Sequence, residues 1–325
     1  MSDYVIGIDL GGTNVKAGVV DDAGKVVAKH ALALNRPKTR RDVLDGIYRA
    51  TEETLKLAKM QADGVRALGI ATPGTLDIAA GVVVKANNIP EWENVPLRDL
   101  LSERFGVPAL LENDANAAAW GEYWVGAGKD VSSMVMLTLG TGIGGGVILD
   151  GKLWHGFRDS AAEIGHMTID YRGRQCACGN IGCLEAYASA DSTVRRFIEA
   201  VRSGKPTNLE RTVTERPEQV TAKLIHEEAL KGDALSRKIL EESGFYLGVG
   251  ITSILHVINP EMVVLTGGMI GAGEMLMESV RRVVSERAVA RTRQDVKIEF
   301  ARLGGDAGFI GAAGCALTGS ETSAS

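Results

Sequence analysis

YVIGIDLGGTNVKAGVVDDAGKVVAKHALAL, residues 4–34, is the stretch of the sequence that most narrows the fold. It holds three runs rich in Val, Ile and Ala, separated by the turns LGGT and DDAGK. Short apolar runs joined by Gly- and Asp-rich turns are typical of consecutive antiparallel strands. This stretch therefore predicts a three-stranded antiparallel meander at the start of the chain.

The same pattern occurs a second time further along the chain. MVMLTLG (134–140) runs into TGIGGGVIL (141–149), followed by the turn Asp150-Gly151 and by KLWHG (152–156). Both copies have a strand, a turn that contains Gly and Thr, and another strand. Two such copies predict two similar domains that face a shared cleft.

The remaining segments alternate between helical and strand-like patterns. Residues 41–60 carry apolar side chains at helical spacing. The other expected elements, in chain order, are a strand at 67–74, a helix at 96–106, a strand running into a helix over 109–126, helices near 186–202 and 220–257, a strand at 260–268 and a helix of small residues at 305–317. Residues 203–218 are polar, and we expect a surface loop there.

Composition and charge exclude several classes of function. The chain has 325 residues, enough for about two domains, with 45% hydrophobic and 24% charged residues. Its net charge is −5 and no run of Lys or Arg forms a basic patch, which argues against nucleic acid and anionic membranes as partners. The N-terminus lacks a signal-peptide pattern, and no apolar stretch reaches the length of a membrane span. A cytoplasmic enzyme is the expectation.

The first motif with chemical content is Asp9-Leu10-Gly11-Gly12-Thr13. Glycines let backbone N–H groups approach phosphate oxygens closely, and the Thr13 hydroxyl adds a donor. A carboxylate at the end of a strand, such as Asp9, is suited to hold hydrated Mg²⁺. A hairpin turn capped by Asp9 explains the same residues equally well.

The second glycine motif is Gly140-Thr141-Gly142-Ile143-Gly144-Gly145-Gly146. So many glycines weaken a strand without a gain in packing, which indicates close approach by a ligand. The motif is neither a Walker A loop nor a dinucleotide-binding loop that opens a helix, because apolar strand-like residues follow. A flexible hairpin is the alternative.

Gly267 and Gly268 form a glycine pair at the end of the apolar strand 262–265. Such a pair lets a flat purine lie against the backbone. An ordinary turn from strand to helix explains it equally well.

Glu112-Asn113-Asp114-Ala115-Asn116-Ala117 places polar residues between an apolar strand and an Ala-rich helix. Asp114 has two interpretations. It is a helix cap, or it is a general base that accepts the proton of an attacking hydroxyl during phosphoryl transfer.

His166 and three cysteines, Cys176, Cys178 and Cys183, lie within eighteen residues of sequence. One imidazole and three thiolates are the four soft ligands of a closed tetrahedral Zn²⁺ site. A closed site leaves no position for substrate, so the predicted zinc is structural. The fourth cysteine, Cys315, lies among small apolar residues and is expected in the core.

Together these motifs resemble the ROK family (repressors, open reading frames and kinases). The family pattern D-x-G-G-T matches 9–13, L-G-T-G-x-G-G-G matches 139–146, and E-N-D-A-N-A matches 112–117. G-H followed by C-x-C-G-x-x-G-C-x-E matches 165–166 and 176–185. The resemblance covers essentially the whole chain.

The resemblance implies an α/β, actin-like (hexokinase-type) fold of two domains around a cleft. The expected boundaries are a small domain at 1–118, a large domain at 119–304 with a zinc loop at 166–185, a helix at about 305–318 that returns to the small domain, and a disordered tail at 319–325.

The resemblance also implies transfer of the ATP γ-phosphate to a sugar hydroxyl, with Asp114 as the catalytic base and Mg²⁺ and structural Zn²⁺ as further cofactors. The residues that match the family's sugar contacts are Asn88, Asn113, Asp114, Glu163, His166 and Glu185. The residues assigned to ATP are Asp9, Gly11, Gly12, Thr13, Gly140, Thr141, Gly142, Gly267 and Gly268. A zinc-bound His166 would aim its second ring nitrogen as a fixed donor to the sugar, so zinc should affect sugar affinity strongly and ATP affinity weakly.

D-Glucose, converted to glucose 6-phosphate, is the expected substrate, and N-acetylmannosamine, fructose and allose are the alternatives within the family. A sugar-binding regulator without catalysis is the alternative from another class. Family repressors carry a DNA-binding segment before the first phosphate motif, which begins here at Asp9, so a kinase is favoured. A homodimer is expected because dimers are common among similar proteins.

Overall fold

The computed structural model describes residues 3–34, 39–86, 89 and 91–322 of the chain. Contacts between residues divide the chain into two compact units. Unit 1 comprises residues 1–132, 146–161 and 301–325, and unit 2 comprises 133–145 and 162–300. The domain boundaries expected from the sequence, after 118 and after 304, stay predictions.

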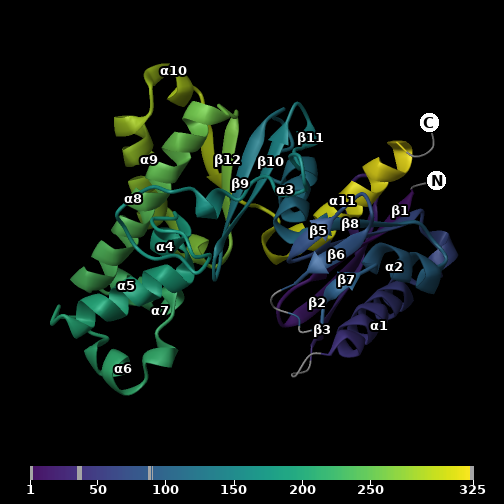
Figure 1. Cartoon of the computed structure of the whole chain (residues 1–325), viewed down its shortest axis with the longest axis horizontal. Coiled ribbons are helices and arrows are strands. Elements are labelled where there is room, and N and C mark those ends of the chain that lie inside the picture. Colours follow the sequence, from purple (N-terminus) through teal and green to yellow (C-terminus); the bar gives the residue numbers. More distant parts are fainter. Residues whose placement is uncertain (1–2, 35–38, 87–88, 90, 323–325) are drawn as a thin grey trace. The chain divides into compact units, whose positions relative to one another are not determined.

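Unit 1 is built on the first expected meander (Figure 1). Its sheet has the order β3-β2-β1-β4-β8. These strands are β1 (Tyr4–Leu10), β2 (Asn14–Asp21), β3 (Val26–Ala33), β4 (Ala67–Thr72) and β8 (Ala109–Asn113). β1 pairs antiparallel with β2, and β2 with β3, which confirms the meander, whereas β4 runs parallel to both β1 and β8.

In unit 1, helices α1 (Arg40–Ala58), α2 (Leu97–Phe105), α3 (Asp114–Val125) and α11 (Ala307–Thr322) lie in segments for which the sequence predicted a helix. The unit also contains the short helices η1 (Ala62–Gly64) and η5 (Gly304–Asp306). A small antiparallel sheet was not expected from the sequence: it consists of β5 (Thr75–Asp77), β6 (Val82–Lys85) and β7 (Glu93–Val95). Each of these strands has at most four residues, too few for a clear alternating pattern.

Alternate residues of β1 face opposite sides of the sheet. Ile6, Ile8 and Leu10 pack in one cluster with residues of α1. Val5 packs on the other side with Phe309 of α11. On this second face the backbones come very close, because a Cβ at Gly7 would overlap the carbonyl oxygen of Phe309.

Unit 2 carries most of the second meander. The second sheet has the order β11-β10-β9-β12-β13, the same arrangement of a meander followed by two parallel strands as the first sheet. Its strands are β9 (Met134–Leu139), β10 (Ile143–Leu149), β11 (Lys152–Leu153), β12 (Met262–Thr266) and β13 (Lys297–Phe300). The chain passes from unit 2 to unit 1 within β10. The repeat seen in the sequence is confirmed.

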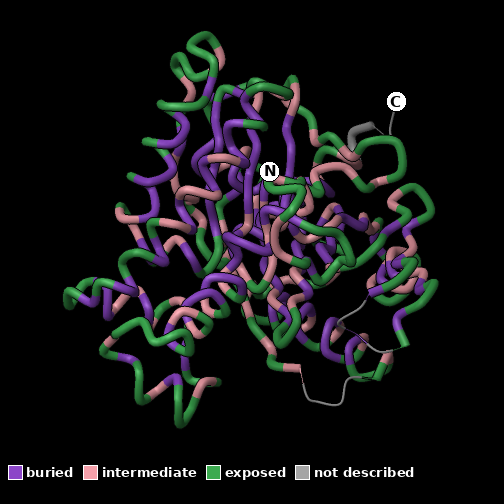
Figure 2. Tube along the Cα trace, turned by 60° about the vertical axis from the view of Figure 1, so that its left-hand side comes forward, coloured by how far each residue is buried: buried purple, intermediate pink, exposed green. Residues whose placement is uncertain are grey.

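Helices make up the rest of unit 2. They are η2 (Ile164–His166), α4 (Glu185–Ala188), α5 (Ala190–Arg202), α6 (Glu210–Glu215), η3 (Pro217–Gln219), α7 (Ala222–Leu230), α8 (Ala234–Val257), η4 (Gly268–Ala272), α9 (Gly273–Arg287) and α10 (Ala290–Arg293). The strands β9 and β12 are almost wholly buried, whereas helices such as α5 and α9 carry both buried and exposed residues, as the alternating colours of the tube in Figure 2 show. None of the helices in the described ranges has the length and apolarity that a membrane span requires.

Two expectations from the sequence are wrong. The surface loop at 203–218 contains helix α6, because Leu209 and Val213, four residues apart, are both buried and pull the segment onto the unit. The expected disordered tail at 319–325 begins as helix, since α11 continues to Thr322. Residues 323–325 lie outside the described part of the chain.

Replacing Gly7 by Ala tests the close contact between β1 and α11. The added Cβ would overlap the Phe309 carbonyl, and overpacking of this kind costs about 1–3 kcal/mol. We expect Gly7→Ala to lower the free energy of unfolding by about that amount in urea denaturation. Gly64→Ala is the matched control, because its Cβ would meet only Met60 Cε at 3.5 Å. Equal stability of both variants would contradict the packing described here.

Candidate functional site

Asp9 is the sixth residue of β1 and faces the same side of the sheet as Gly7. Burial and, to a lesser extent, the neighbouring Asp114 carboxylate raise the pKa of Asp9 to about 6, while Lys16 acts in the opposite direction. Lys16 is the cross-strand partner of Asp9 on β2, and its Nζ donates to the carbonyl of Gly305 at 2.5 Å. A largely buried carboxylate beside a second carboxylate is suited to a divalent cation.

The glycine turn after Asp9 is tight and open to solvent. The N–H of Gly11 donates to the carbonyl of Asn14 at 2.9 Å, and Gly12 and Thr13 are exposed. The first turn of α11 lies beside it, because a Cβ at Gly308 would come within 2.6 Å of Asp9 Oδ2. Helix N-termini favour anions, so this corner of unit 1 can take both a cation and phosphate oxygens.

Asp114 is the first residue of α3, but it is not the cap of that helix. Asn113 is the N-cap: its Oδ1 accepts from the N–H groups of Ala115 at 3.0 Å and Asn116 at 3.2 Å. Burial raises the pKa of Asp114, and the hydrogen bond from the N–H of Ala115 only partly offsets this. The capping interpretation of Asp114 is therefore wrong. With its oxygen bound to the helix, Asn113 offers its amide N–H groups to a ligand.

A Glu–His pair beside this helix was missed in the sequence. Glu112 is only 2% exposed, and its Oε2 lies 2.8 Å from Nε2 of His155. Its Oε1 accepts from the N–H of Asn113 and from Nδ2 of Asn116. The bond to Glu112 raises the pKa of His155 above its usual range, against the effect of burial. The sequence did contain one signal of this pair. A Glu at the end of an apolar strand is expected to be buried, and a buried charge needs a partner.

In unit 2, the glycine motif forms the turn between β9 and β10. The N–H of Gly140 donates to the carbonyl of Gly142 at 3.0 Å, and the N–H of Gly144 donates to Thr138 Oγ1 at 3.1 Å. No acceptor in the described part of the chain is bonded to the N–H groups of Thr141 and Gly142. These two groups at the tip are therefore available to a phosphate.

The Gly267-Gly268 pair follows β12 and opens onto a cavity. Gly267 has φ 96°, and a Cβ there would lie 2.5 Å from the carbonyl oxygen of Leu139, so both conformation and space require glycine. Gly268 lines a cavity of about 210 Å³. The other lining residues are Ala222, Lys223, His226, Glu227, Met269, Gly271 and Ala272. A small, mostly apolar cavity at the carboxyl end of a parallel strand suits a purine base.

The His and Cys residues converge, as predicted. One ligand atom from each of His166, Cys176, Cys178 and Cys183 lies within 4.8 Å of all the others. The Sγ atoms of Cys178 and Cys183 are 3.7 Å apart. Two sulfurs bound to Zn²⁺ at about 2.3 Å in a tetrahedron would be separated by about 3.8 Å.

Local geometry also fits a cation at this cluster. Gly179, with φ 94°, closes the turn by donating from its N–H to the carbonyl of Cys176. Burial raises the pKa of the Cys176 thiol to about 12, so this thiol stays protonated unless a cation takes the place of its proton. The four residues therefore fit the zinc site that the sequence predicted.

The ring of His166 presents its two nitrogens to different partners. Nδ1 lies 3.8 Å from Sγ of Cys176, and Nε2 lies 3.9 Å from Oε2 of Glu163, whose side chain is exposed. A metal on Nδ1 would leave Nε2 protonated and pointing outward with Glu163. Glu185, at the start of α4, also belongs to unit 2, whereas Asn113 and Asp114 belong to unit 1. Asn88 lies outside the described residues.

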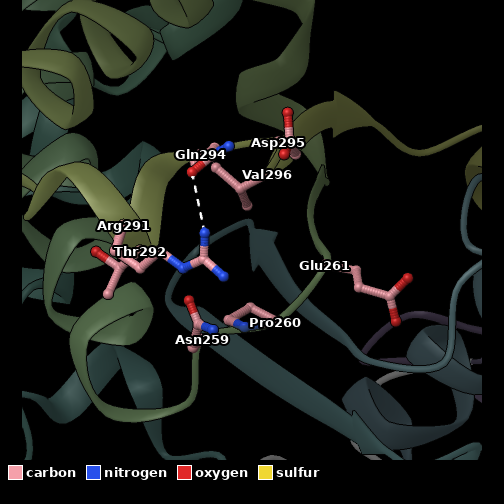
Figure 3. Close-up of a pocket in the computed structure, with 8 residues that line it drawn as sticks. All are labelled: Asn259, Pro260, Glu261, Arg291, Thr292, Gln294, Asp295 and Val296. Carbon is pink, nitrogen blue, oxygen red and sulfur yellow. Dashed lines mark hydrogen bonds between the residues drawn. The ribbon is translucent and has the colours of Figure 1, made fainter.

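A further cavity of about 250 Å³ lies at the opposite end of β12 (Figure 3). Asn259, Pro260 and Glu261 line it just before β12, and Arg291 crosses it toward Gln294, to whose Oε1 it donates at 3.4 Å. Among the described residues, none of those predicted to bind substrate lines this cavity. Ligands of parallel sheets bind at the carboxyl ends of strands, so we do not assign this cavity to the active site.

The raised pKa of Asp9 makes a prediction about stability and pH. Below pH 3.8 the carboxyl is neutral in the folded and unfolded states, and burial costs nothing. Above about pH 6 it is ionised in both, and the folded state is destabilised by on the order of 3 kcal/mol.

We therefore expect Asp9→Asn, without ligands, to be more stable than the unchanged protein at pH 7. The difference in the free energy of unfolding should shrink as the pH falls from 6 to 4, which urea denaturation at several pH values measures. A difference that does not vary with pH would contradict the buried state of this carboxylate.

Comparison with known proteins identifies the family of this chain. The model of the ROK family matches residues 5–318. The glucokinase of Thermotoga maritima is 37% identical over 311 residues, which are 95% of this chain and 96% of that protein. The xylose repressor of Caldicellulosiruptor bescii is 31% identical over 92% of this chain and 74% of its own length.

A solved structure is similar to this chain in both sequence and fold. The ROK family glucokinase from Streptomyces griseus, in complex with glucose and AMPPNP, is 33% identical, with a TM-score of 0.81 over 97% of this chain and 99% of that one. This similarity confirms the two-unit, actin-like α/β fold expected from the sequence. The chain belongs to the ROK family.

Proposed function

We propose that this protein transfers the γ-phosphate of ATP to a hexose, and that its substrate is D-glucose. The observation that carries the proposal is Asp114: a carboxylate at a helix start that does not cap the helix and whose pKa is raised by burial. A raised pKa makes a carboxylate a stronger proton acceptor. ROK glucokinases similar along nearly the whole chain support the choice of reaction.

In this proposal the sugar hydroxyl oxygen attacks the γ-phosphorus of ATP, its proton passes to Asp114, and ADP leaves. Phosphoryl transfer is catalysed mainly by positioning and by neutralising charge. Asp9 would hold Mg²⁺, which neutralises phosphate charge. The exposed turn at Gly12 and Thr13 and the N–H groups of Thr141 and Gly142 would contact phosphate oxygens, and the cavity at Gly268 would take the adenine.

We propose that the sugar is held by hydrogen-bonding side chains, namely those of Asn113, Asp114, Glu163, His166 and Glu185. Asn88 stays a prediction. N-Acetylmannosamine is the alternative substrate, because the same polar groups serve several pyranoses. A regulator without catalysis is the alternative class, which the similarity to a xylose repressor keeps open.

We further propose that His166, Cys176, Cys178 and Cys183 hold a structural Zn²⁺. The ion would fix the orientation of His166, so that its outer ring N–H becomes an oriented donor near Glu163. Three metal-binding thiols persist in a reducing compartment, which favours the cytoplasm. A homodimer stays a prediction.

A coupled assay of ADP release with ATP, Mg²⁺ and a panel of hexoses tests the reaction. We expect turnover with glucose to exceed that with N-acetylmannosamine, fructose or allose. Asp114→Asn should lower kcat by about 10²–10⁴-fold and leave glucose binding intact, because the amide cannot accept the proton.

Asp45→Asn, which removes an exposed carboxylate from α1, is the control and should behave like the unchanged protein. ADP release that no sugar stimulates would rule out the proposed kinase. Full activity of Asp114→Asn would rule out its role as the base.

Metal analysis of freshly purified protein tests the zinc site. We expect about one zinc per chain, and loss of most of it in Cys178→Ser, because a hydroxyl is a poor zinc ligand. Cys315→Ala is the matched control, since that buried cysteine lies in α11, far along the chain from the cluster. Zinc content unchanged in Cys178→Ser, or absent from the unchanged protein, would refute the site.

A further inference from the structure

Glu185 lies between the cysteine cluster and the glycine turn of unit 2. It is the first residue of α4, two positions after Cys183. Its Oε2 accepts a hydrogen bond from the N–H of Ile143 at 2.8 Å, and its Oε1 lies 3.7 Å from Sγ of Cys176. One carboxylate thus contacts the cluster with one oxygen and the turn with the other.

The glycine at position 142 is explained by this carboxylate. A Cβ at Gly142 would overlap Oε2 of Glu185. Gly142 is not among the glycines with positive φ, so the position requires space and not an unusual backbone conformation. The sequence alone attributed this glycine to the approach of phosphate, but the structure shows a side chain of the protein in that space.

A second bond holds the other side of the same turn. The N–H of Ala190, the first residue of α5, donates to the carbonyl of Gly140 at 2.9 Å. Residues 185–190 therefore hold the turn at both of its ends. The N–H groups left for a ligand are those of Thr141 and Gly142, which lie between the two attachment points.

We propose that Glu185 is a positioning residue for the phosphate-binding turn: its bond to the Ile143 N–H fixes the turn so that the Thr141 and Gly142 N–H groups point at the nucleotide. This inference rests on the proposed function as an ATP-dependent kinase. It adds to the proposed sugar contact of Glu185, because a carboxylate has about four acceptor positions and the Ile143 N–H occupies one.

A double-mutant cycle on nucleotide binding tests the proposal. Binding of AMPPNP with Mg²⁺, measured by calorimetry without sugar, reports the turn independently of turnover. Glu185→Ala removes the acceptor, and Gly142→Ala displaces it, so we expect each to raise the Kd about ten-fold. Because both act through one contact, the double variant should bind no more weakly than Glu185→Ala. Effects that multiply to about a hundred-fold would show that Gly142 acts on phosphate directly and would overturn the proposal.

Two further variants of Glu185 separate the effect of side-chain length on nucleotide binding from the effect of charge. Glu185→Gln keeps an oxygen at the same distance and loses the charge, whereas Glu185→Asp keeps the charge and is one methylene too short. We expect the Kd of Glu185→Gln to stay within about three-fold of the unchanged protein and that of Glu185→Asp to rise about ten-fold. The reverse order would overturn the proposal, because it would mean that charge and not the bond to Ile143 matters.

Glu199→Gln is the matched control for the cysteine segment. Glu199 accepts from Arg174 at 2.7 Å, so the variant loosens the same segment without touching the turn, and its Kd should not change. Circular dichroism of every variant confirms folding. Failure of the unchanged protein to bind AMPPNP would refute the kinase function itself, whereas normal binding by Glu185→Ala and Glu185→Asp would refute only the role of Glu185.

Discussion

Unit 1 depends on one constraint: the backbone of α11 packs directly against the backbones of its neighbours, with no side chain between them. A Cβ at Gly7 of β1 or at Gly69 of β4 would overlap carbonyl oxygens of α11, and a Cβ at Gly311 of α11 would overlap the carbonyl of Ala117 in α3. The helix is therefore in backbone contact with the sheet on one side and with α3 on the other. Contacts this close leave little freedom for the three elements to shift against one another.

This constraint also positions the two candidate active-site carboxylates, Asp9 and Asp114. Asp9 stands two residues after Gly7 and so faces α11, where Gly308 of the first turn leaves room for its carboxylate. Asp114 begins α3, the helix that Gly311 contacts. Elements packed on α11 thus bring two carboxylates close enough to raise the pKa of Asp9. Binding of a divalent cation would offset the cost of burying both charges. Holding such a cation is the role proposed for Asp9 in the kinase.

The sequence predicted the features that depend on local patterns. The two meanders, the long helices and the His–Cys cluster follow from strand alternation, helical spacing and ligand spacing, each of which is visible within about twenty residues. The short strands β5–β7 and the helix α6 carry too few residues for such a pattern. The bond between Glu112 and His155 joins residues far apart in sequence, and only the folded chain brings them together. The sequence likewise assigned Glu185 to the sugar alone, because nothing local indicates its bond to Ile143.

The hydrogen bond between Glu185 and the Ile143 N–H changes the expected effect of a structural metal on ligand binding in unit 2. The sequence indicated an effect on sugar affinity through His166, with little effect on ATP. In the structure the cluster contacts residues proposed for the sugar and residues that hold the phosphate-binding turn. His166 Nε2 points toward Glu163, while Cys176 contacts Glu185, which accepts a hydrogen bond from the Ile143 N–H. A metal bound to the cysteines would fix the segment from which Glu185 and Ala190 reach the turn. It would therefore organise the groups proposed for the sugar and the groups proposed for phosphate together, although it touches neither ligand.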